Sequence, residues 1–157
     1  MKGIIFIHGL ESSGQGYKGR FFRKIFPNIL TPDFKGELNE RMEQLITTLL
    51  KFEKISIIGS SFGGLMATIY AEKFPEKVSQ LILLAPALNF YNFNKETFNK
   101  INTPTTIIHG SKDEIVPLFP TKKIAEQIFK NLDFIIVDDN HLLHKTIENI
   151  NWLSLLK

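Results

Sequence analysis

The sequence contains no cysteine, and this absence excludes several kinds of chemistry at once. Disulfide bonds, thiolate metal sites and a cysteine nucleophile all require this residue. The chain also lacks any apolar run near the ~20 residues that a membrane-spanning helix needs. The apolar stretch at residues 4–7 is too short for a signal peptide. We therefore expect a cytoplasmic protein with no stable membrane association.

The chain also lacks a large excess of positive or negative charge, because its formal net charge is only +3. The basic residues are scattered along the chain and form no stripe. Nucleic-acid-binding proteins cluster Lys and Arg on one face, so no nucleic-acid partner is expected. A chain of 157 residues with 43% hydrophobic and 22% charged residues suits one soluble globular domain, residues 1–157.

Short apolar runs rich in Ile and Val recur along the chain and are continuous rather than alternating. Such runs are typical of strands buried on both faces of a parallel sheet. Segments of helical period separate them, and this alternation indicates an α/β protein, a three-layer αβα sandwich. A weaker strand is expected at 28–34. The other expected strands are 4–7, 55–58, 78–85, 105–109 and 133–137, and the expected helices are 20–26, 37–52, 62–74, 121–131 and 144–157.

Glycines crowd the turn between the strand at 55–58 and the helix that follows it. Residues 59–63 read Gly-Ser-Ser-Phe-Gly and fit the pattern G-x-S-x-G, with Ser61 at its centre. A tight strand-to-helix turn strains its central residue and leaves room only for glycine two positions away. It also lifts the central hydroxyl above the carboxyl edge of the sheet, at a helix N-terminus. The alternative is a glycine-rich packing turn, since the bare pattern also arises by chance.

A serine becomes a nucleophile only when a base takes its proton and a carboxylate orients that base. Asp113 and His141 each lie just past the carboxyl end of an expected strand. Because these ends share one edge of a parallel sheet, we expect both residues to lie near Ser61.

Other readings of these two residues stay open. Glu114 is an alternative orienting group, one residue farther along, and His144 is an alternative base at the start of the last helix. Asp113 could also be a turn-forming aspartate and His141 a helix-entry histidine.

The oxyanion of an acyl-transfer reaction needs N–H donors that are already aimed at it. The amide of Phe62, directly after the serine, is one candidate, and the amide of Leu10 in the loop after the first strand is the other. The alternative is that residues 8–9 only end a strand.

The segment 86–103 is the least regular part of the chain and carries several aromatic side chains. Phe90, Tyr91 and Phe93 follow the strand at 78–85, close to the expected active edge. We expect them to line an apolar substrate pocket, with mere coverage of the sheet as the alternative.

Four motifs, "IFIHGLESSG", "IIGSSFGG", "IIHGSKDEIVP" and "DDNH", resemble those of the α/β-hydrolase superfamily in order and spacing. They are most similar to its short bacterial esterases without a cap domain. The resemblance implies that Ser61 is the nucleophile, that Asp113 and His141 complete a catalytic triad, and that the amides of Leu10 and Phe62 form the oxyanion hole.

The chain departs from this family in two ways. It begins at the strand that carries His8 and Gly9, so the resemblance implies about six strands, all parallel. The insertion that forms a lid in many relatives is reduced to residues 86–103.

The expected activity is hydrolysis of small carboxylic esters through an acyl-enzyme intermediate. No metal or cofactor is needed for this chemistry, and activity should fall as pH drops through roughly 6 to 7, because a protonated histidine cannot act as a base. A thioesterase, an amidase or peptidase with the same triad, and a non-catalytic hydrolase-like binding protein are the alternatives.

Overall fold

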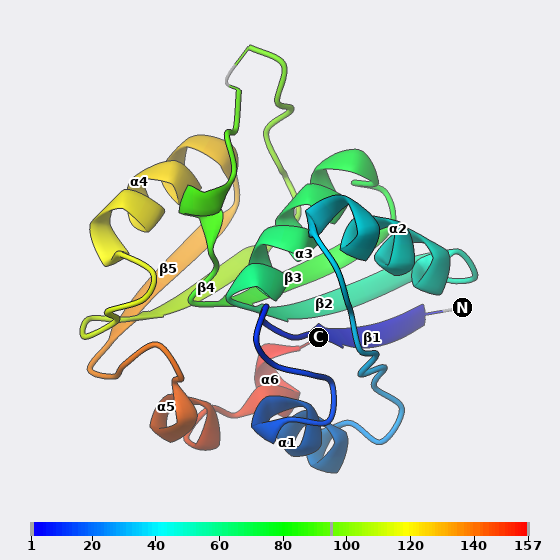
Figure 1. Ribbon diagram of the computed structural model, residues 1–157, viewed down its shortest axis with the longest axis horizontal. Coiled ribbons are helices and arrows are strands. Elements are labelled where there is room, and N and C mark those ends of the chain that lie inside the picture. The colour runs from blue at the N-terminus through cyan, green and yellow to red at the C-terminus, as the bar shows by residue number, and fades with distance from the viewer. Residues whose placement is uncertain (1, 95, 157) are drawn as a thin grey trace.

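In the computed structural model, which describes residues 2–94 and 96–156, a parallel sheet forms the centre of the molecule (Figure 1). Every pairing between neighbouring strands is parallel. The five strands lie in the order of the sequence: β1 (Lys2–Ile7), β2 (Lys54–Ser60), β3 (Val78–Leu84), β4 (Thr105–Gly110) and β5 (Leu132–Val137).

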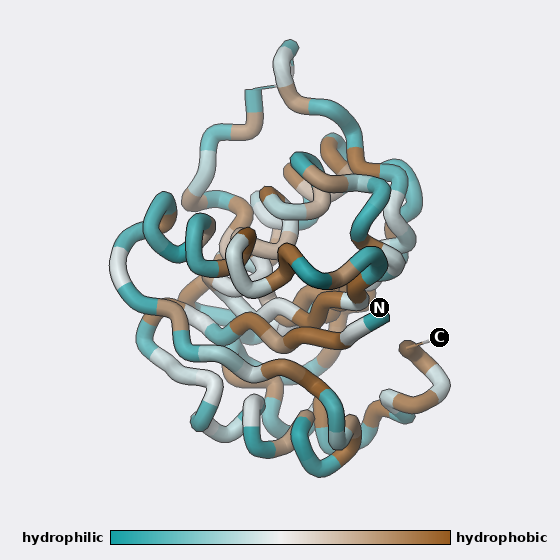
Figure 2. The backbone as a smooth tube through the Cα atoms, turned by 90° about the vertical axis from the view of Figure 1, so that its right-hand side faces the viewer, coloured by the Kyte–Doolittle hydropathy of each residue, from teal (hydrophilic) through white to brown (hydrophobic). Residues whose placement is uncertain are grey.

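Helices cover both faces of the sheet, as the αβα sandwich predicts (Figure 1). One face packs against α2 (Leu38–Leu49), α3 (Phe62–Lys73) and α4 (Leu118–Ile128), and the other against α1 (Tyr17–Ile25), α5 (His144–Glu148) and α6 (Trp152–Leu155). Each face has its own hydrophobic core. Figure 2 shows the apolar segments concentrated through the middle of the molecule, where the strands run.

The expected strand at 28–34 is not a full strand. Leu30 alone bridges to β1: its N–H donates to Ile4 O at 2.9 Å, and Phe6 N–H donates to its carbonyl at 2.8 Å. Pro32, two residues farther on, has no N–H with which to continue the ladder. The sheet therefore has five strands rather than about six.

The expected C-terminal helix at 144–157 is divided into α5 and α6. Asn151 caps α6, because its side chain accepts a hydrogen bond from Ser154 N–H at 3.2 Å. Trp152 is buried against Phe22 of α1, with ring centroids 4.8 Å apart, and its indole N–H donates to Ile147 O at 2.8 Å. These contacts turn the chain back toward α1 and end the first helix.

The last strand was expected to be buried on both faces, but it is partly exposed. β5 is the edge of the sheet, and its Ile135 and Ile136 side chains are 44% and 46% exposed. The connection from β3 to β4 contains the short helix η1 (Leu88–Phe90) and protrudes beyond α3 and α4 (Figure 1). No helix in the described part of the chain is both long and apolar enough to cross a bilayer.

Candidate active site

Ser61 lies at the sharp turn where β2 ends and α3 begins. Its backbone has φ 54° and ψ −117°, a conformation that is strained for a residue with a side chain. The turn is held by the backbone of Ser61, whose N–H donates to Leu84 O at 2.9 Å and whose carbonyl accepts from Ala87 N–H at 3.0 Å. Neighbouring β3 and its following loop therefore fix the position of the serine.

The glycines beside Ser61 are required by close backbone contacts. A Cβ atom at Gly63 would lie 2.0 Å from the carbonyl oxygen of Ile7 at the end of β1. A Cβ atom at Gly59 would lie 2.6 Å from the carbonyl oxygen of Gly63. The first turn of α3 can approach β1 only because these positions have no side chain.

Ser61, His141 and Asp113 form a continuous hydrogen-bonded chain. His141 Nε2 lies 3.1 Å from Ser61 Oγ, and His141 Nδ1 lies 2.7 Å from Asp113 Oδ2. Because an ionised carboxylate only accepts hydrogen bonds, the imidazole proton belongs on Nδ1, and Nε2 is left to accept from the serine hydroxyl. The Asp113 side chain is fully buried and that of His141 is 17% exposed.

The two alternative residues are not part of this hydrogen-bonded chain. The His144 ring stacks on Tyr17, with ring centroids 3.9 Å apart. Glu114 is exposed, and it is the carboxylate of Asp113 that His141 contacts.

A second histidine, which sequence reasoning missed, supports Asp113. His109 at the end of β4 is fully buried, and its Nε2 lies 2.9 Å from Val116 O and 3.4 Å from Asp113 Oδ2. Burial is the main cause that lowers the pKa of His109, so the ring is neutral near pH 7. A histidine inside an otherwise apolar strand is the sequence signal that could have revealed it.

Backbone amides complete the surroundings of Asp113. Its Oδ1 atom accepts from Ile115 N–H at 2.9 Å and Val116 N–H at 2.8 Å. With both oxygens engaged, the carboxylate is held in one orientation toward the imidazole.

Leu10 and Phe62 line the same cavity as Ser61. Neither amide donates a hydrogen bond to any other residue that the structure describes. The loop after β1 passes close to the serine, since a Cβ atom at Gly9 would lie 3.4 Å from Ser61 Cβ. Within the described residues, both amides thus remain without an acceptor.

Two further residues that the sequence did not single out brace this loop. His8 is buried, its Nε2 accepts from Phe34 N–H at 2.8 Å, and its Nδ1 lies 2.6 Å from Gly9 O. Arg41 of α2 donates from Nη2 to Leu10 O at 3.3 Å, and its guanidinium lies 5.6 Å from the Phe62 ring centroid. Arg41 therefore contacts both Leu10 and Phe62, which line the cavity.

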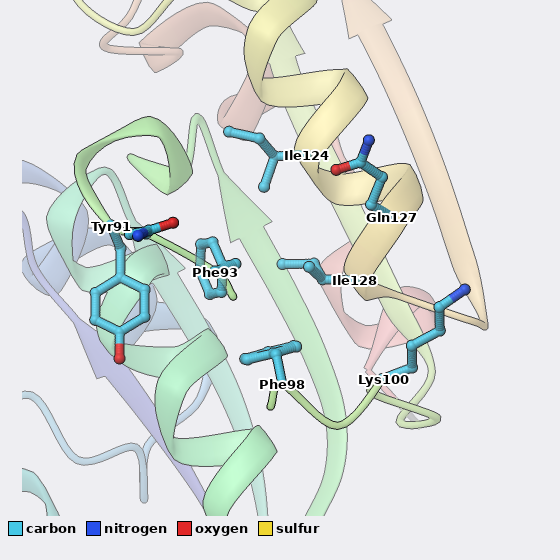
Figure 3. Close-up of a pocket in the computed structure, with 8 residues that line it drawn as sticks. Tyr91, Phe93, Phe98, Lys100, Ile124, Gln127 and Ile128 are labelled. Carbon is cyan, nitrogen blue, oxygen red and sulfur yellow. The ribbon is translucent and has the colours of Figure 1, made fainter. Parts of the chain in front are cut away.

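A cavity of about 660 Å³ opens above Ser61. Only one of the three expected pocket aromatics, Phe90, lines it. Tyr91 and Phe93 line a separate cavity of about 400 Å³ against α4, which is a correction to the sequence-based expectation. Figure 3 shows Phe93 beside Ile124 and Ile128 of α4. These two aromatics therefore do not line the cavity at the serine.

No group of three or more His, Cys, Asp or Glu side chains within residues 2–94 and 96–156 could hold a metal ion.

A family model described as "alpha/beta hydrolase fold" matches residues 33–97, which include the turn at Ser61. A predicted CIB-like hydrolase from Thermoplasma acidophilum superimposes with a TM-score of 0.77 at 23% identity, covering 99% of this chain and 87% of that chain. The chain has the α/β-hydrolase fold. An alpha-beta serine hydrolase homologue from Coxiella burnetii superimposes on this chain with a TM-score of 0.79 at 22% identity, covering 100% of this chain and 85% of that one.

A curated relative adds an enzyme name to this likeness. Methylesterase 1 of Arabidopsis thaliana is 44% identical over 48 residues, which are 31% of this chain and 18% of the methylesterase. The chain spans less than half the length of each curated relative that it matches. The resemblance to the α/β-hydrolase superfamily is confirmed, with hydrolases and esterases among its relatives.

Proposed function

We propose that the protein is a serine hydrolase that cleaves small carboxylic esters through an acyl-enzyme intermediate. The observation that carries this proposal is the hydrogen-bonded chain from Ser61 Oγ through His141 to Asp113, at the mouth of a cavity. A nucleophile, a base and an orienting carboxylate within hydrogen-bond reach are the parts that acyl transfer needs.

In the first half of the reaction, Ser61 Oγ attacks the ester carbonyl carbon and His141 Nε2 takes the hydroxyl proton. The carbonyl oxygen becomes an oxyanion, which the free amides of Leu10 and Phe62 stabilise. His141 then gives its proton to the departing alcohol oxygen as the ester bond breaks, which leaves the acyl group on Ser61.

In the second half, water attacks the acyl carbon and gives a proton to His141. The C–O bond to Ser61 breaks, the serine oxygen regains the proton, and the carboxylic acid leaves. Asp113 stays ionised throughout and holds the imidazole, since its two oxygens already accept hydrogen bonds from His141 and from two amides.

The cavity walls support a substrate of modest size. Much of the lining is apolar and includes Phe90, Ile115 and Leu142. All three side chains are more than half exposed, so they offer contact area near the serine without enclosing it. Esters with short acyl or aromatic parts suit such a site, and the methylesterase relative is consistent with a small alcohol group.

Burst kinetics test the proposal directly. Purified protein mixed with p-nitrophenyl acetate or butyrate should release about one equivalent of nitrophenol per active site before the steady rate, because an acyl-enzyme forms first. The variant Ser61→Ala should lose both the burst and the turnover, by roughly 10,000-fold or more. Ser79→Ala, at an exposed serine of β3, is the matched control and should behave as the unchanged protein. Turnover that persists in Ser61→Ala would contradict the proposal.

A further inference from the structure

Lys18 lies in the first turn of α1, on the opposite face of the sheet from α3, yet it lines the same cavity as Ser61 and His141. Its side chain is half-buried, and Tyr17 and His144 line the cavity beside it. The mechanism above gives this lysine no part. It is the only cationic side chain, apart from the histidines, among the described residues that line the cavity.

The ammonium of Lys18 has no close anionic partner among the described residues, since no carboxylate lies within ion-pair distance of it. Asp139 exerts the main attraction, but its Oδ2 already accepts from the Thr146 hydroxyl at 2.7 Å and its Oδ1 from Asn140 N–H at 2.8 Å. Burial lowers the pKa of Lys18 to about 8, which leaves it mostly protonated at pH 7. A partly desolvated cation of this kind gains strongly from an added anion.

The backbone near Lys18 also carries a positive partial charge. Helix α1 begins at Tyr17 after Gly16, and its first turn contains no acidic residue, so the positive end of the helix is not neutralised there. Glu11 also lines the cavity and would repel a doubly charged group. A ligand with one anionic group can therefore approach the ammonium of Lys18 with less repulsion from Glu11 than a doubly charged one.

Building on the proposed hydrolase activity, we propose that Lys18 binds a free carboxylate of the substrate, so that the preferred substrates are esters that carry a carboxylate. The apolar walls at Phe90 and Leu142 contact the hydrocarbon part, and Ser61 attacks the ester carbonyl. Half-esters of dicarboxylic acids, with one end esterified and the other free, belong to this class.

Two matched substrate pairs test the proposal. Ethyl hydrogen adipate against ethyl hexanoate places the charge in the acyl part, and 4-acetoxybenzoate against its methyl ester places it in the alcohol part. In at least one pair, kcat/KM for the charged ester should exceed that for the neutral ester by about 10- to 100-fold, as a hydrogen bond to a charged group allows. Equal rates within both pairs would overturn the proposal.

Variants of Lys18 assign the preference to this residue. Lys18→Met keeps the apolar stem and removes the charge, so the charged-to-neutral ratio should fall at least about tenfold, while Lys18→Arg should retain most of it. Lys24→Met, at an exposed position of the same helix, is the matched control and should keep the ratio of the unchanged protein. If the charged-to-neutral ratio of kcat/KM is unchanged in Lys18→Met, the preference does not come from Lys18.

The pH profile of the unchanged protein tests the same point without any substitution. The ratio should be constant below about pH 8 and fall above it, because the ammonium then loses its proton. Asp139, His144 and Tyr17 lie around Lys18, and Glu11 also lines the cavity. Although desolvation opposes them, hydrogen bonds from Thr146 and Asn140 lower the pKa of Asp139. Burial lowers the pKa of His144, and the hydrogen bond to Glu148 raises the pKa of Tyr17. All three shifts lead away from pH 8. A ratio that stays flat through pH 9 contradicts the role of Lys18.

The outcomes separate this inference from the proposed function. If neither member of either pair is hydrolysed, the hydrolase proposal itself fails. If the neutral and charged esters are cleaved equally well, the hydrolase proposal stands and only the role of Lys18 is lost.

Discussion

The cavity at Ser61 takes its walls largely from the loops that follow the strands and from the first residues of helices. The cavity at Phe93 takes its walls from residues of the connection after β3 and from α4. In the first, Ser61, Asp113 and His141 follow β2, β4 and β5 and are held by backbone hydrogen bonds or buried contacts. In the second, Tyr91, Phe93 and the other lining residues bring no hydrogen-bonded chain of catalytic type.

The comparison teaches where chemistry is placed in such a sheet. The sheet holds the backbone in place at the strand ends. The loops that begin there carry the reactive side chains, so these side chains can be held within hydrogen-bond distance of one another. The connection after β3 instead offers apolar volume whose shape depends on ring packing, with Phe93 and Phe98 centroids 5.1 Å apart. We expect substitutions in the two cavities to differ in kind as well as in size.

Gly63→Ala should have the largest effect, because it attacks the backbone contact that shapes the first cavity. The added Cβ would meet Ile7 O at 2.0 Å, so α3 must move away from β1. We expect about 3 kcal/mol of lost stability and near-complete loss of ester hydrolysis. Thermal unfolding and a p-nitrophenyl acetate assay measure the two effects.

Gly9→Ala is the control for that substitution. Its Cβ would contact Ser61 Cβ at 3.4 Å, which is ordinary van der Waals distance, so the stability should change little. Equal melting temperatures for Gly63→Ala and the unchanged protein would contradict the role given to Gly63 in the turn between β2 and α3.

His109→Gln should have an intermediate effect that depends on pH. Burial lowers the pKa of His109 below its ordinary 6.5. Below about pH 6.5 this histidine is therefore protonated in the unfolded chain but still neutral in the folded protein. As a result, the free energy of unfolding falls by up to about 1.4 kcal/mol for each unit by which the pH is lowered. The stabilising contribution is present above that pH and is lost as the pH drops.

Urea unfolding between about pH 5 and pH 7 measures this slope. The glutamine variant should show a shallower slope, although His8 still contributes because burial also lowers its pKa. An unchanged slope would mean that His109 is already protonated in the folded protein.

Phe90→Ala and Phe93→Ala should give the smallest effects and separate the two cavities. Phe90 lines the cavity at Ser61, so its removal should change the butyrate-to-acetate ratio of kcat/KM by about tenfold. Phe93 lines the other cavity, so its removal should leave that ratio within about twofold and cost about 1 to 2 kcal/mol of stability. A larger effect of Phe93→Ala on this ratio would mean that Phe93 also takes part in substrate binding, so that the two cavities act as one site.

The sequence predicted the sheet and the meeting of three side chains, because both follow from local pattern. Continuous apolar runs mark parallel strands, and polar residues just past their carboxyl ends must share one edge. The resemblance to known hydrolases pointed to the same three residues, Ser61, Asp113 and His141. The distances of 3.1 and 2.7 Å come from the structure alone.

What the sequence did not predict depends on contacts between distant segments. The Asn151 cap is a local signal for the start of α6, but the packing of Trp152 on Phe22 that accompanies the break joins distant segments. The contact of His109 with Asp113, and the place of Lys18 in the cavity, likewise depend on which way each side chain faces in the folded chain. Tyr91 and Phe93 were misplaced for the same reason, since nearness to an active edge in sequence does not fix orientation.

Labelling with a fluorophosphonate tests the nucleophile most directly, because this reagent needs an activated serine beside a base and reports the modified residue by mass spectrometry of peptides. The account predicts one phosphonyl group, on the peptide that contains Ser61, and none in Ser61→Ala. Labelling on another serine, or no labelling of the unchanged protein, would contradict it.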